Sequence, residues 1–301
     1  TIINGGIINS FGNNYRLGLG KWMVVEADES DGTFLKLPHE INIITNIDYE
    51  HLDYFRNIKN LLSSFEKFST NIPFYGYSII CLDNINSRKL VHKIKTRKVI
   101  TYGHNNKKAD LNIIKILTKK NHTLFSINIK KNIFPNYKNF YKFKLNLFGK
   151  HNILNALAAI TVAFLLKIPM NQTLSALENF QGVKRRFTLL GKINKCKVYD
   201  DYAHHPTEIK ASFEIAKHLA EKKIIVIFQP HRFSRTRDLY NDFLKILRKI
   251  DVLFICDIYS AGEQPIQNIT SLNLVKDLKK NNSKKIYYLK EPKKINQVLS
   301  K

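Results

Sequence analysis

The chain has 301 residues, 44% of them hydrophobic, and its 49 lysine and arginine residues exceed its 24 acidic residues to give a formal charge of +25. This length and hydrophobic content suit two globular domains and exclude a fibrous or intrinsically disordered chain. The three cysteines, Cys81, Cys196 and Cys256, are far apart and lack metal-ligand spacing, so we expect a reducing cytoplasm and neither disulfides nor a zinc site.

The positive charge has two possible explanations. Dense lysine and arginine often indicates nucleic acid or an anionic membrane as a partner, because it releases counterions from phosphates. Here the excess is mostly lysine, spread along the chain among asparagine and isoleucine. We therefore expect a solvated surface that helps to attract anionic small substrates, with no nucleic-acid partner. The apolar runs at 156–168 and 224–228 are too short or interrupted for membrane insertion.

The first part of the chain alternates strand and helix patterns. The predicted elements are, in order, buried strands at 22–27 and 41–47, a helix at 58–68, a strand at 77–82, antiparallel strands within 111–147 and a buried helix at 151–166. Together they predict an α/β domain with a mostly parallel sheet plus a small antiparallel sheet, which we place at 1–183.

A connector at 181–186 precedes a second alternation. The predicted elements are a strand at 197–199, a helix at 206–220, a strand at 224–228, a helix at 239–250, a strand at 252–256, and a further helix and strand. They predict a Rossmann-like α/β domain with a second parallel sheet, which we place at 184–301.

The densest acidic cluster, Glu26 to Asp31, follows the first predicted strand. Carboxylates there can hold a hard divalent cation, although a solvated turn or a helix start explains them as well. A second polar segment, 45–53, follows the next predicted strand and contains His51, which alone is more typical of a hydrogen-bonded structural histidine. Because both strands should end at the same sheet edge, we favour a shared site there.

The segment 148–155 opens the predicted buried helix. Asn152 and Asn155 should lie near one face with His151, where an asparagine can cap the helix or contact the edge of a base. Arg186, in the connector, is a candidate contact for a bound molecule or an ordinary surface arginine. The residues by themselves leave both pairs of alternatives open.

Two polar segments follow predicted strands of the second domain. In 200–208, Pro206 starts a helix with Glu208 in its first turn, and the two histidines before it can simply cap that helix. In 230–237, three arginines suit bidentate capture of a carboxylate or phosphate, with a basic surface turn as the alternative. Both segments are therefore candidate substrate contacts.

Taken together, these segments resemble signatures of the Mur ligases, a family of ATP-dependent cell-wall enzymes, and in particular its alanine-adding members. The matching segments are Glu-Ala-Asp-Glu-Ser-Asp at 26–31, the stretch 71–76, Gly-Lys-His-Asn at 149–152, Asp-Asp-Tyr-Ala-His-His-Pro at 200–206 and Pro-His-Arg-Phe-Ser-Arg-Thr at 230–236. The resemblance implies a central ATP-binding domain followed by a C-terminal amino-acid-binding domain.

The resemblance also implies a role for each matching residue. It assigns magnesium to Glu26 and His51, the ATP nucleotide to Asn152, Asn155, Arg186 and Asp201, the substrates to Tyr202, His204, Arg232 and Arg235, and catalysis to His204, Arg232 and Arg235. The implied reaction joins L-alanine to UDP-N-acetylmuramate: the muramoyl carboxylate takes the γ-phosphoryl group of ATP, and the alanine amine then displaces phosphate. An oligomeric state is not implied.

The sequence departs from the family pattern at both ends. It contains no Gly-x-x-x-x-Gly-Lys-Ser/Thr phosphate loop, it begins at Thr1, and the expected Gly-Ala-Gly-Asn segment is missing near its end. We therefore expect a fragment that is inactive alone. Two alternatives remain: a murein-tripeptide recycling ligase of the same family, which the form of 230–236 disfavours, and a basic nucleic-acid-binding protein, which salt-dependent retention of RNA or DNA would reveal.

Overall fold

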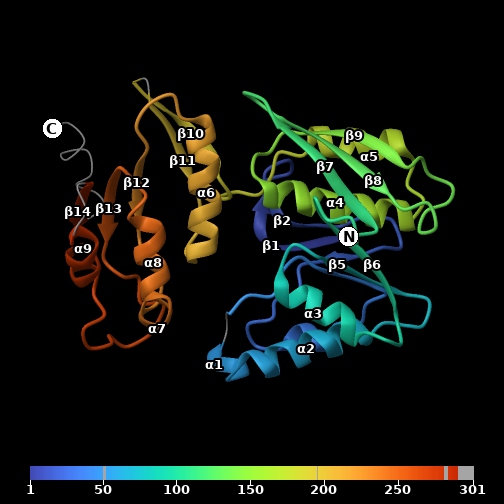
Figure 1. Ribbon diagram of the computed structural model, residues 1–301, viewed down its shortest axis with the longest axis horizontal. Helices are drawn as coiled ribbons and strands as arrows, with labels where there is room; N and C mark the ends of the chain where they lie inside the picture. Colours follow the sequence, from blue (N-terminus) through green and yellow to red (C-terminus); the bar gives the residue numbers. More distant parts are fainter. Residues whose placement is uncertain (50–51, 195, 281–283, 291–301) are drawn as a thin grey trace. The chain divides into compact units, whose positions relative to one another are not determined.

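The computed structural model describes residues 1–49, 52–194, 196–280 and 284–290. The chain divides into two compact units, Thr1–Lys184 (unit 1) and Arg185–Lys301 (unit 2), and both are α/β (Figure 1). Among the helices that the structure describes, not one combines the length and apolar composition needed to cross a bilayer. All three cysteines are free, with Cys81 and Cys256 buried and Cys196 exposed.

The main sheet of unit 1 has the order β4-β5-β6-β7-β8-β9 within the described residues. Its strands are β4 Ile41–Ile44, β5 Tyr77–Cys81, β6 Lys98–His104, β7 Leu111–Thr118, β8 Thr123–Ile129 and β9 Phe140–Leu145. β4 to β7 pair in parallel, whereas β7, β8 and β9 pair antiparallel. The predicted antiparallel strands are thus confirmed, but they extend the parallel sheet instead of forming a sheet of their own.

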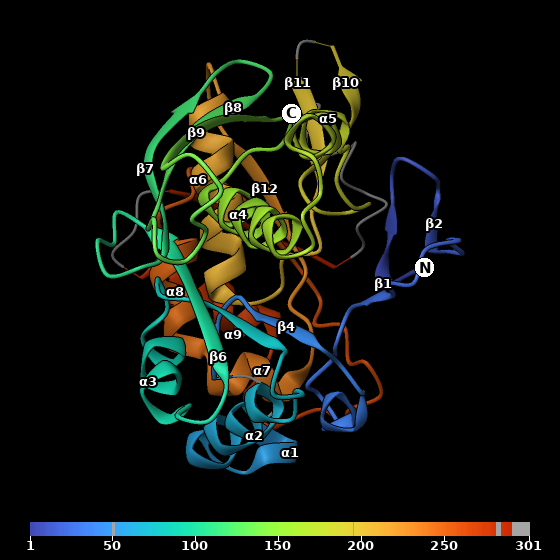
Figure 2. The ribbon, with the colours of Figure 1, turned by 90° about the vertical axis from the view of Figure 1, so that its right-hand side faces the viewer.

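Helices cover both faces of this sheet. They are the short 3-10 helix η1 Thr33–Lys36 and the α-helices α1 Leu52–Phe55, α2 Ile58–Thr70, α3 Ile85–Lys93, α4 Lys150–Leu165 and α5 Met170–Asn179. Successive side chains of a strand point to opposite faces, so Ile79 joins the core packed against α4, while Ile80 joins the core packed against α2 and α3. Figures 1 and 2 show α2 and α3 on one side of the sheet and α4 on the other.

The first predicted strand is the main error in unit 1. Only Val24–Val25 forms a strand (β3), and it pairs in parallel with β1, Ile2–Ile8, which also pairs with β2, Asn13–Arg16. β3 therefore belongs to a separate small sheet and does not lie beside β4. The burial explains this result: Val24 is exposed and Val25 is only half-buried, unlike residues of a central strand, which are covered on both faces.

Unit 2 contains a parallel sheet of order β12-β13-β14 in its described part. Its elements are β12 Ile225–Phe228, β13 Val252–Cys256, β14 Lys285–Leu289, α6 Pro206–Leu219, α7 Phe233–Asp238, α8 Tyr240–Leu247 and α9 Ser271–Lys279. Apolar side chains of α6, α8 and α9 share one core with this sheet. The Rossmann-like arrangement is confirmed.

The predicted strand at 197–199 exists but lies elsewhere than expected. It is β11, Cys196–Asp200, and it pairs antiparallel with β10, Thr188–Ile193, in a two-stranded ribbon separate from the parallel sheet. Most of the ribbon's side chains are exposed or half-buried, which explains why its short apolar pattern did not distinguish a ribbon from a core strand.

Candidate functional site

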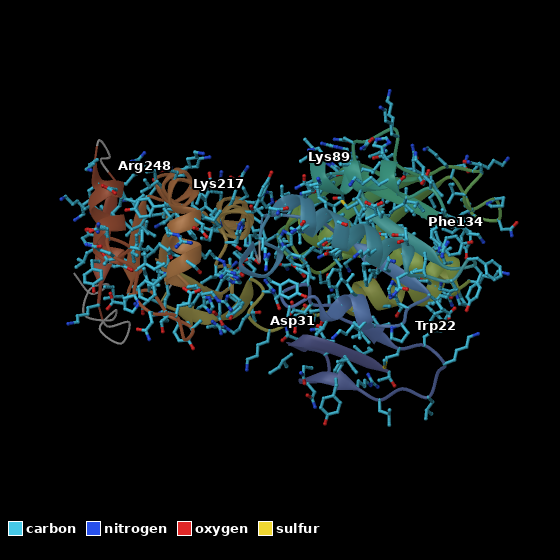
Figure 3. The ribbon with its side chains drawn as sticks, turned by 90° about the horizontal axis from the view of Figure 1, so that it is seen from below. Trp22, Asp31, Lys89, Phe134, Lys217 and Arg248 are labelled. Atoms are coloured by element: carbon cyan, nitrogen blue, oxygen red, sulfur yellow. The ribbon has the colours of Figure 1, made fainter. Side chains whose placement is uncertain are left out.

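The acidic segment after β3 forms a turn held by its own side chains. Asp28 Oδ1 accepts a hydrogen bond from the Ser30 amide (2.8 Å), and Asp31 Oδ1 accepts one from the Thr33 amide (2.9 Å). The bonds from the Thr33 hydroxyl and amide also lower the pKa of Asp31, which lies at the surface of unit 1 (Figure 3). For these two carboxylates the solvated-turn interpretation describes the contacts seen.

Glu26 has a different environment from the rest of the acidic segment. Its Oε2 accepts a hydrogen bond from the Gly5 amide at 2.5 Å, so the carboxylate of the residue after β3 is bound to the backbone of β1. A Cβ at position 5 would lie 3.0 Å from the same oxygen, so glycine permits this close approach. Glu26 is exposed, and its second oxygen is the one that this bond leaves available.

The acidic segment and the segment after β4 line one small pocket, although their strands belong to different sheets. Glu29, Asn46 and Asp48 provide its polar lining, and Ile47, Leu61 and Phe65 complete it. Asn86 on α3 donates to the Ile47 carbonyl (2.9 Å) and so fixes this segment. His51 lies outside the described residues. In the part that is described, no group of three or more His, Cys, Asp or Glu side chains is arranged to hold a metal.

The two predicted asparagines lie in different environments in the first turns of α4. His151 and Asn155 are both exposed, as residues four apart on one helix face should be. Asn152 is half-buried and donates from Nδ2 to the Phe148 carbonyl at 2.8 Å. Asn155 therefore presents its amide outward, whereas Asn152 is bound to the backbone that enters the helix.

Beside this helix start lies an ion pair that the sequence interpretation missed. Lys150 Nζ is 2.5 Å from Asp83 Oδ2, and the other oxygen of Asp83 accepts from the His104 amide (2.8 Å). Burial, with Lys150 next in importance, lowers the pKa of His104. A carboxylate directly after the apolar strand β5 was the available signal, because the carboxyl ends of parallel strands are common places for binding sites.

In unit 2 the segment 200–208 begins α6 with a capping box. The His205 side chain accepts from the Thr207 amide (3.3 Å), and Glu208 Oε2 accepts from the backbone amides of His204 (3.0 Å) and His205 (3.2 Å). Burial acts to raise the pKa of Glu208, but these bonds and the charges of His204 and Arg186 together lower it. Capping thus accounts for His205, which is buried, but not for His204.

His204 takes part in a row of rings that joins both polar segments of unit 2. Its centroid lies 5.2 Å from that of Tyr202 and 5.4 Å from that of His231, and His231 in turn lies 5.2 Å from Tyr259. His204 Nδ1 is 2.8 Å from the Tyr202 carbonyl, which can only accept, so Nδ1 carries the proton. In the neutral ring, Nε2 of His204 is then an acceptor.

The arginine segment approaches this row from α7. Arg235 Nη1 lies 3.4 Å from His231 Nδ1, a contact in which the guanidinium donates and the imidazole accepts. Burial, followed by the charges of His204, Arg235 and Arg232, lowers the pKa of His231 and favours its neutral form. The four predicted substrate residues of unit 2 therefore lie near His231 or near one another. They are Tyr202, His204, Arg232 and Arg235.

The two remaining predicted residues of unit 2 are Arg186, in the connector, and Asp201, near the start of the segment 200–208. Arg186 is about half exposed, at 54%, and its Nη1 is 3.5 Å from Glu208 Oε1. Asp201 accepts from the Ala203 amide (3.0 Å) and from the Ser212 hydroxyl (2.5 Å), so both of its oxygens have partners. Arg186 is thus connected to the histidine segment through Glu208.

Chemically, the unit 2 cluster combines guanidiniums, a neutral imidazole and tyrosine rings. Guanidiniums bind carboxylates in bidentate fashion, and a neutral imidazole can accept a proton from an amine or hydroxyl. Such a set suits the holding of carboxylate reactants during acyl or phosphoryl transfer better than redox chemistry or metal hydrolysis.

Comparison with known proteins agrees with this architecture. Residues 20–163 match the family model described as the Mur ligase middle domain, and residues 185–300 match the Mur ligase, glutamate ligase domain. The UDP-N-acetylmuramate--L-alanine ligase of Allorhizobium ampelinum is 43% identical over 300 residues, which are 100% of this chain and 64% of that protein. The chain thus spans less than two thirds of the length of this relative.

Two solved structures extend the comparison. The UDP-N-acetylmuramate-alanine ligase of Thermotoga maritima superposes with a TM-score of 0.76 at 29% identity, covering 98% of this chain and 61% of that one. The MurF ligase of the same organism, in complex with ADP, gives a TM-score of 0.73 at 17% identity, covering 100% of this chain and 66% of that one, a likeness of fold. With two domain models of one family matched in order along it, the chain belongs to the Mur ligase family.

Proposed function

We propose that the protein containing this chain is an ATP-dependent ligase that joins L-alanine to UDP-N-acetylmuramate. The observation that carries the proposal is the cluster in unit 2, where Arg235, His231 and His204 are neighbours within a chain that is 43% identical to an alanine ligase. Relatives named for the same reaction in several organisms support the choice of amino acid.

The chemistry assigned to the cluster is the positioning of two carboxylates and one amine. A muramoyl carboxylate oxygen bonds to the γ-phosphorus of ATP, and ADP leaves. The neutral amine of L-alanine then bonds to the acyl carbon, phosphate leaves, and the amine loses a proton. We assign Arg232 and Arg235 to the reactant carboxylates, with Tyr202 beside them, because paired guanidiniums hold carboxylates in fixed orientation. We assign His204 Nε2, an acceptor in the neutral ring, to receive the amine proton.

We assign magnesium to the pocket side of unit 1. Mg²⁺ is usually held by one or two carboxylates together with waters and substrate phosphates, so a full cluster of protein ligands is not required. Glu29, Asn46 and Asp48 line one pocket, and Glu26 lies in the same segment as Glu29. These oxygen donors fit the ion, and we retain Glu26 and His51 as the proposed ligands. When bound, the ion would neutralise charge on the phosphates.

We assign the nucleotide to Asn155 first, because its amide is exposed on α4, and to Asn152, Arg186 and Asp201 as supporting residues. Asn152 and Asp201 already have hydrogen bonds within their own units, so we expect each of them to contribute less to a nucleotide contact than Asn155. The ADP complex of the Thermotoga maritima MurF ligase, which shares the fold, supports a nucleotide in this family.

The decisive experiment measures phosphate release by the full-length protein. We expect release that requires ATP, Mg²⁺, UDP-N-acetylmuramate and L-alanine together, with the amide product identified by mass spectrometry. Replacing L-alanine by the murein tripeptide should abolish product, and efficient use of the tripeptide would instead establish the recycling ligase. Failure to form product with every substrate present would refute the proposal, and salt-dependent retention on RNA or DNA without nucleotide turnover would favour the non-enzymatic alternative.

The surface charge is arranged in a way that supports the enzyme over the nucleic-acid alternative. Lys89, Lys217 and Arg248, on three different helical segments, are all exposed (Figure 3). Several lysines pair with neighbouring carboxylates, among them Lys217 with Glu214 (2.7 Å) and Lys245 with Asp242 (2.9 Å). Paired, scattered cations match a solvated surface more closely than a phosphate-binding stripe.

A further inference from the structure

The loop that follows β13 lies against the arginine segment. The Arg232 amide donates to the Tyr259 carbonyl (2.8 Å), and the Tyr259 amide donates to the Pro230 carbonyl (2.9 Å). His231 and Tyr259 form a parallel bridge, and their rings are 5.2 Å apart. Backbone pairing therefore sets the loop 257–263 in register with the residues that start α7.

Glu263, at the end of this loop, binds the start of α7 with both carboxylate oxygens. Oε2 accepts from the Ser234 amide at 2.9 Å, and Oε1 accepts from the Ser234 hydroxyl at 2.5 Å. Burial acts to raise the pKa of Glu263, but these bonds, one from the Phe233 amide and the charge of Arg232 together lower it. The carboxylate is therefore ionised, and both of its oxygens accept hydrogen bonds from Ser234 at the start of α7.

The segment needs such support. Arg232 has a φ of 70°, a backbone conformation that residues other than glycine rarely adopt unless their surroundings impose it. α7 has six residues, which is too short to be stable by itself. Arg232 and Arg235 must nevertheless present their guanidiniums in a fixed relation within this one turn. The Thr236 hydroxyl donates to the Arg232 carbonyl (2.8 Å) and so holds the end of the turn that lies away from Glu263.

We propose that Glu263 is a positioning residue: by binding Ser234 and the first amides of α7, it holds Arg232 and Arg235 in the orientation that receives a substrate carboxylate. It acts through α7 and does not touch the substrate. Its hydrogen bonds direct both carboxylate oxygens to the start of α7. The link to substrate rests on the proposed function, whereas the link to α7 does not.

The first experiment tests the hold on α7 in the chain itself, independently of activity. Hydrogen–deuterium exchange is compared in Glu263→Ala, Glu263→Gln and the matched control Asp277→Asn, whose carboxylate accepts from the Tyr240 hydroxyl (2.8 Å) in the same unit. We expect Glu263→Ala to accelerate exchange over 232–238 by about tenfold or more, Glu263→Gln to do so less, and the control to leave it unchanged. Unchanged exchange over 232–238 in Glu263→Ala would overturn the proposal.

The second experiment tests the link to substrate in the full-length protein. We expect Glu263→Ala to raise KM for a carboxylate substrate, UDP-N-acetylmuramate or L-alanine, by about tenfold, while KM for ATP changes by less than about twofold. Glu263→Gln should recover part of the loss, because its amide oxygen still accepts from the Ser234 hydroxyl. An inactive wild-type protein refutes the proposed function and leaves the exchange result to decide the hold on α7. An active wild type with unchanged KM values in Glu263→Ala would show that the hold does not serve substrate binding.

Discussion

Lys150, the first residue of α4, places its Nζ 2.5 Å from Oδ2 of Asp83, the second residue after β5. The side chain of Asp83 is only 16% exposed, and its other oxygen binds the His104 amide. We expect Asp83→Asn to lower the free energy of unfolding by about 1–2 kcal/mol, because the charge-assisted bond between Lys150 and a largely buried carboxylate is lost. Urea denaturation measures this change.

A surface ion pair in the same unit serves as the control for that prediction. Lys93 and Glu66 lie 3.4 Å apart, and both are more than a third exposed, at 48% and 37%. Glu66→Gln should therefore change the free energy of unfolding by less than about 0.5 kcal/mol. Equal effects of the two substitutions would contradict the special role of the Asp83 pair.

The two asparagines of α4 should separate nucleotide binding from stability. Asn155 is exposed, so Asn155→Ala should weaken ADP binding by about tenfold, equivalent to about 1.4 kcal/mol, with little change in unfolding. Asn152 donates to the Phe148 carbonyl, so Asn152→Ala should mainly lower the free energy of unfolding, by about 1 kcal/mol. Calorimetric titration with ADP and urea denaturation measure both quantities, and the reverse pattern would assign the base contact to Asn152.

His231 should make stability depend on pH below its ordinary pKa of 6.5. Burial first, and then the charges of His204, Arg235 and Arg232, lower its pKa in the folded protein. As the pH falls below 6.5, the unfolded chain takes up the proton before the folded one does, so stability decreases until the pH reaches the lower folded value. The lowered pKa values of Glu208 and Glu263 act in the same direction, but only below their ordinary value of 4.5.

His231→Gln should therefore flatten the loss of unfolding free energy between pH about 6.5 and about 5. His104, whose pKa is also lowered, provides the matched substitution in unit 1, and His104→Gln should flatten the same window independently. A wild-type protein equally stable across this range would contradict both assignments.

The sequence predicted the elements well and their partners less well. Apolar periodicity located α2, α6, β5 and β13 within a residue or two, because each buries apolar side chains in the hydrophobic cores, the helices on one face and the strands on both. Periodicity carries no information about which strand a strand pairs with. For this reason β3 and β11 were assigned to the large sheets, although they pair in small ones.

The same limit applies to the candidate site. The motif residues Tyr202, His204, Arg232 and Arg235 could be selected from the sequence, because unusual residues cluster after strands. Asp83 and Glu263 were not selected, since each is a single carboxylate whose importance comes from a partner 67 and 29 residues away, Lys150 and Ser234 respectively. Such pairings depend on the strand order, which local pattern does not provide.

Glu26 provides a test of the proposed metal site. Its Oε2 accepts from the Gly5 amide, so Glu26→Gln can preserve the backbone contact through the amide oxygen while it removes the charge. We expect this variant to need about tenfold more Mg²⁺ for half-maximal phosphate release, because a hard cation binds an amide oxygen more weakly than a carboxylate. Asp31→Asn, in the same acidic turn, is the control and should leave the Mg²⁺ requirement unchanged. An unchanged requirement in Glu26→Gln would remove Glu26 from the site.

The arginine segment offers a comparison within one helix. Arg235 contacts His231, whereas Arg237 is 52% exposed and pairs with its neighbour Asp238 at 2.7 Å. Arg235→Ala should lower kcat/KM for the carboxylate substrates by about 100-fold, or about 2.7 kcal/mol, because a charge-assisted bidentate contact is lost.

Arg235→Lys should recover only part of this loss, because an ammonium keeps the charge but cannot contact a carboxylate and the His231 ring with a planar fork. Arg237→Ala should remain within about twofold of the wild type, because its partner Asp238 is an exposed carboxylate. If Arg237→Ala were as impaired as Arg235→Ala, the segment would act through its net charge alone. The ring contact with His231 would then have no part in orienting the substrate.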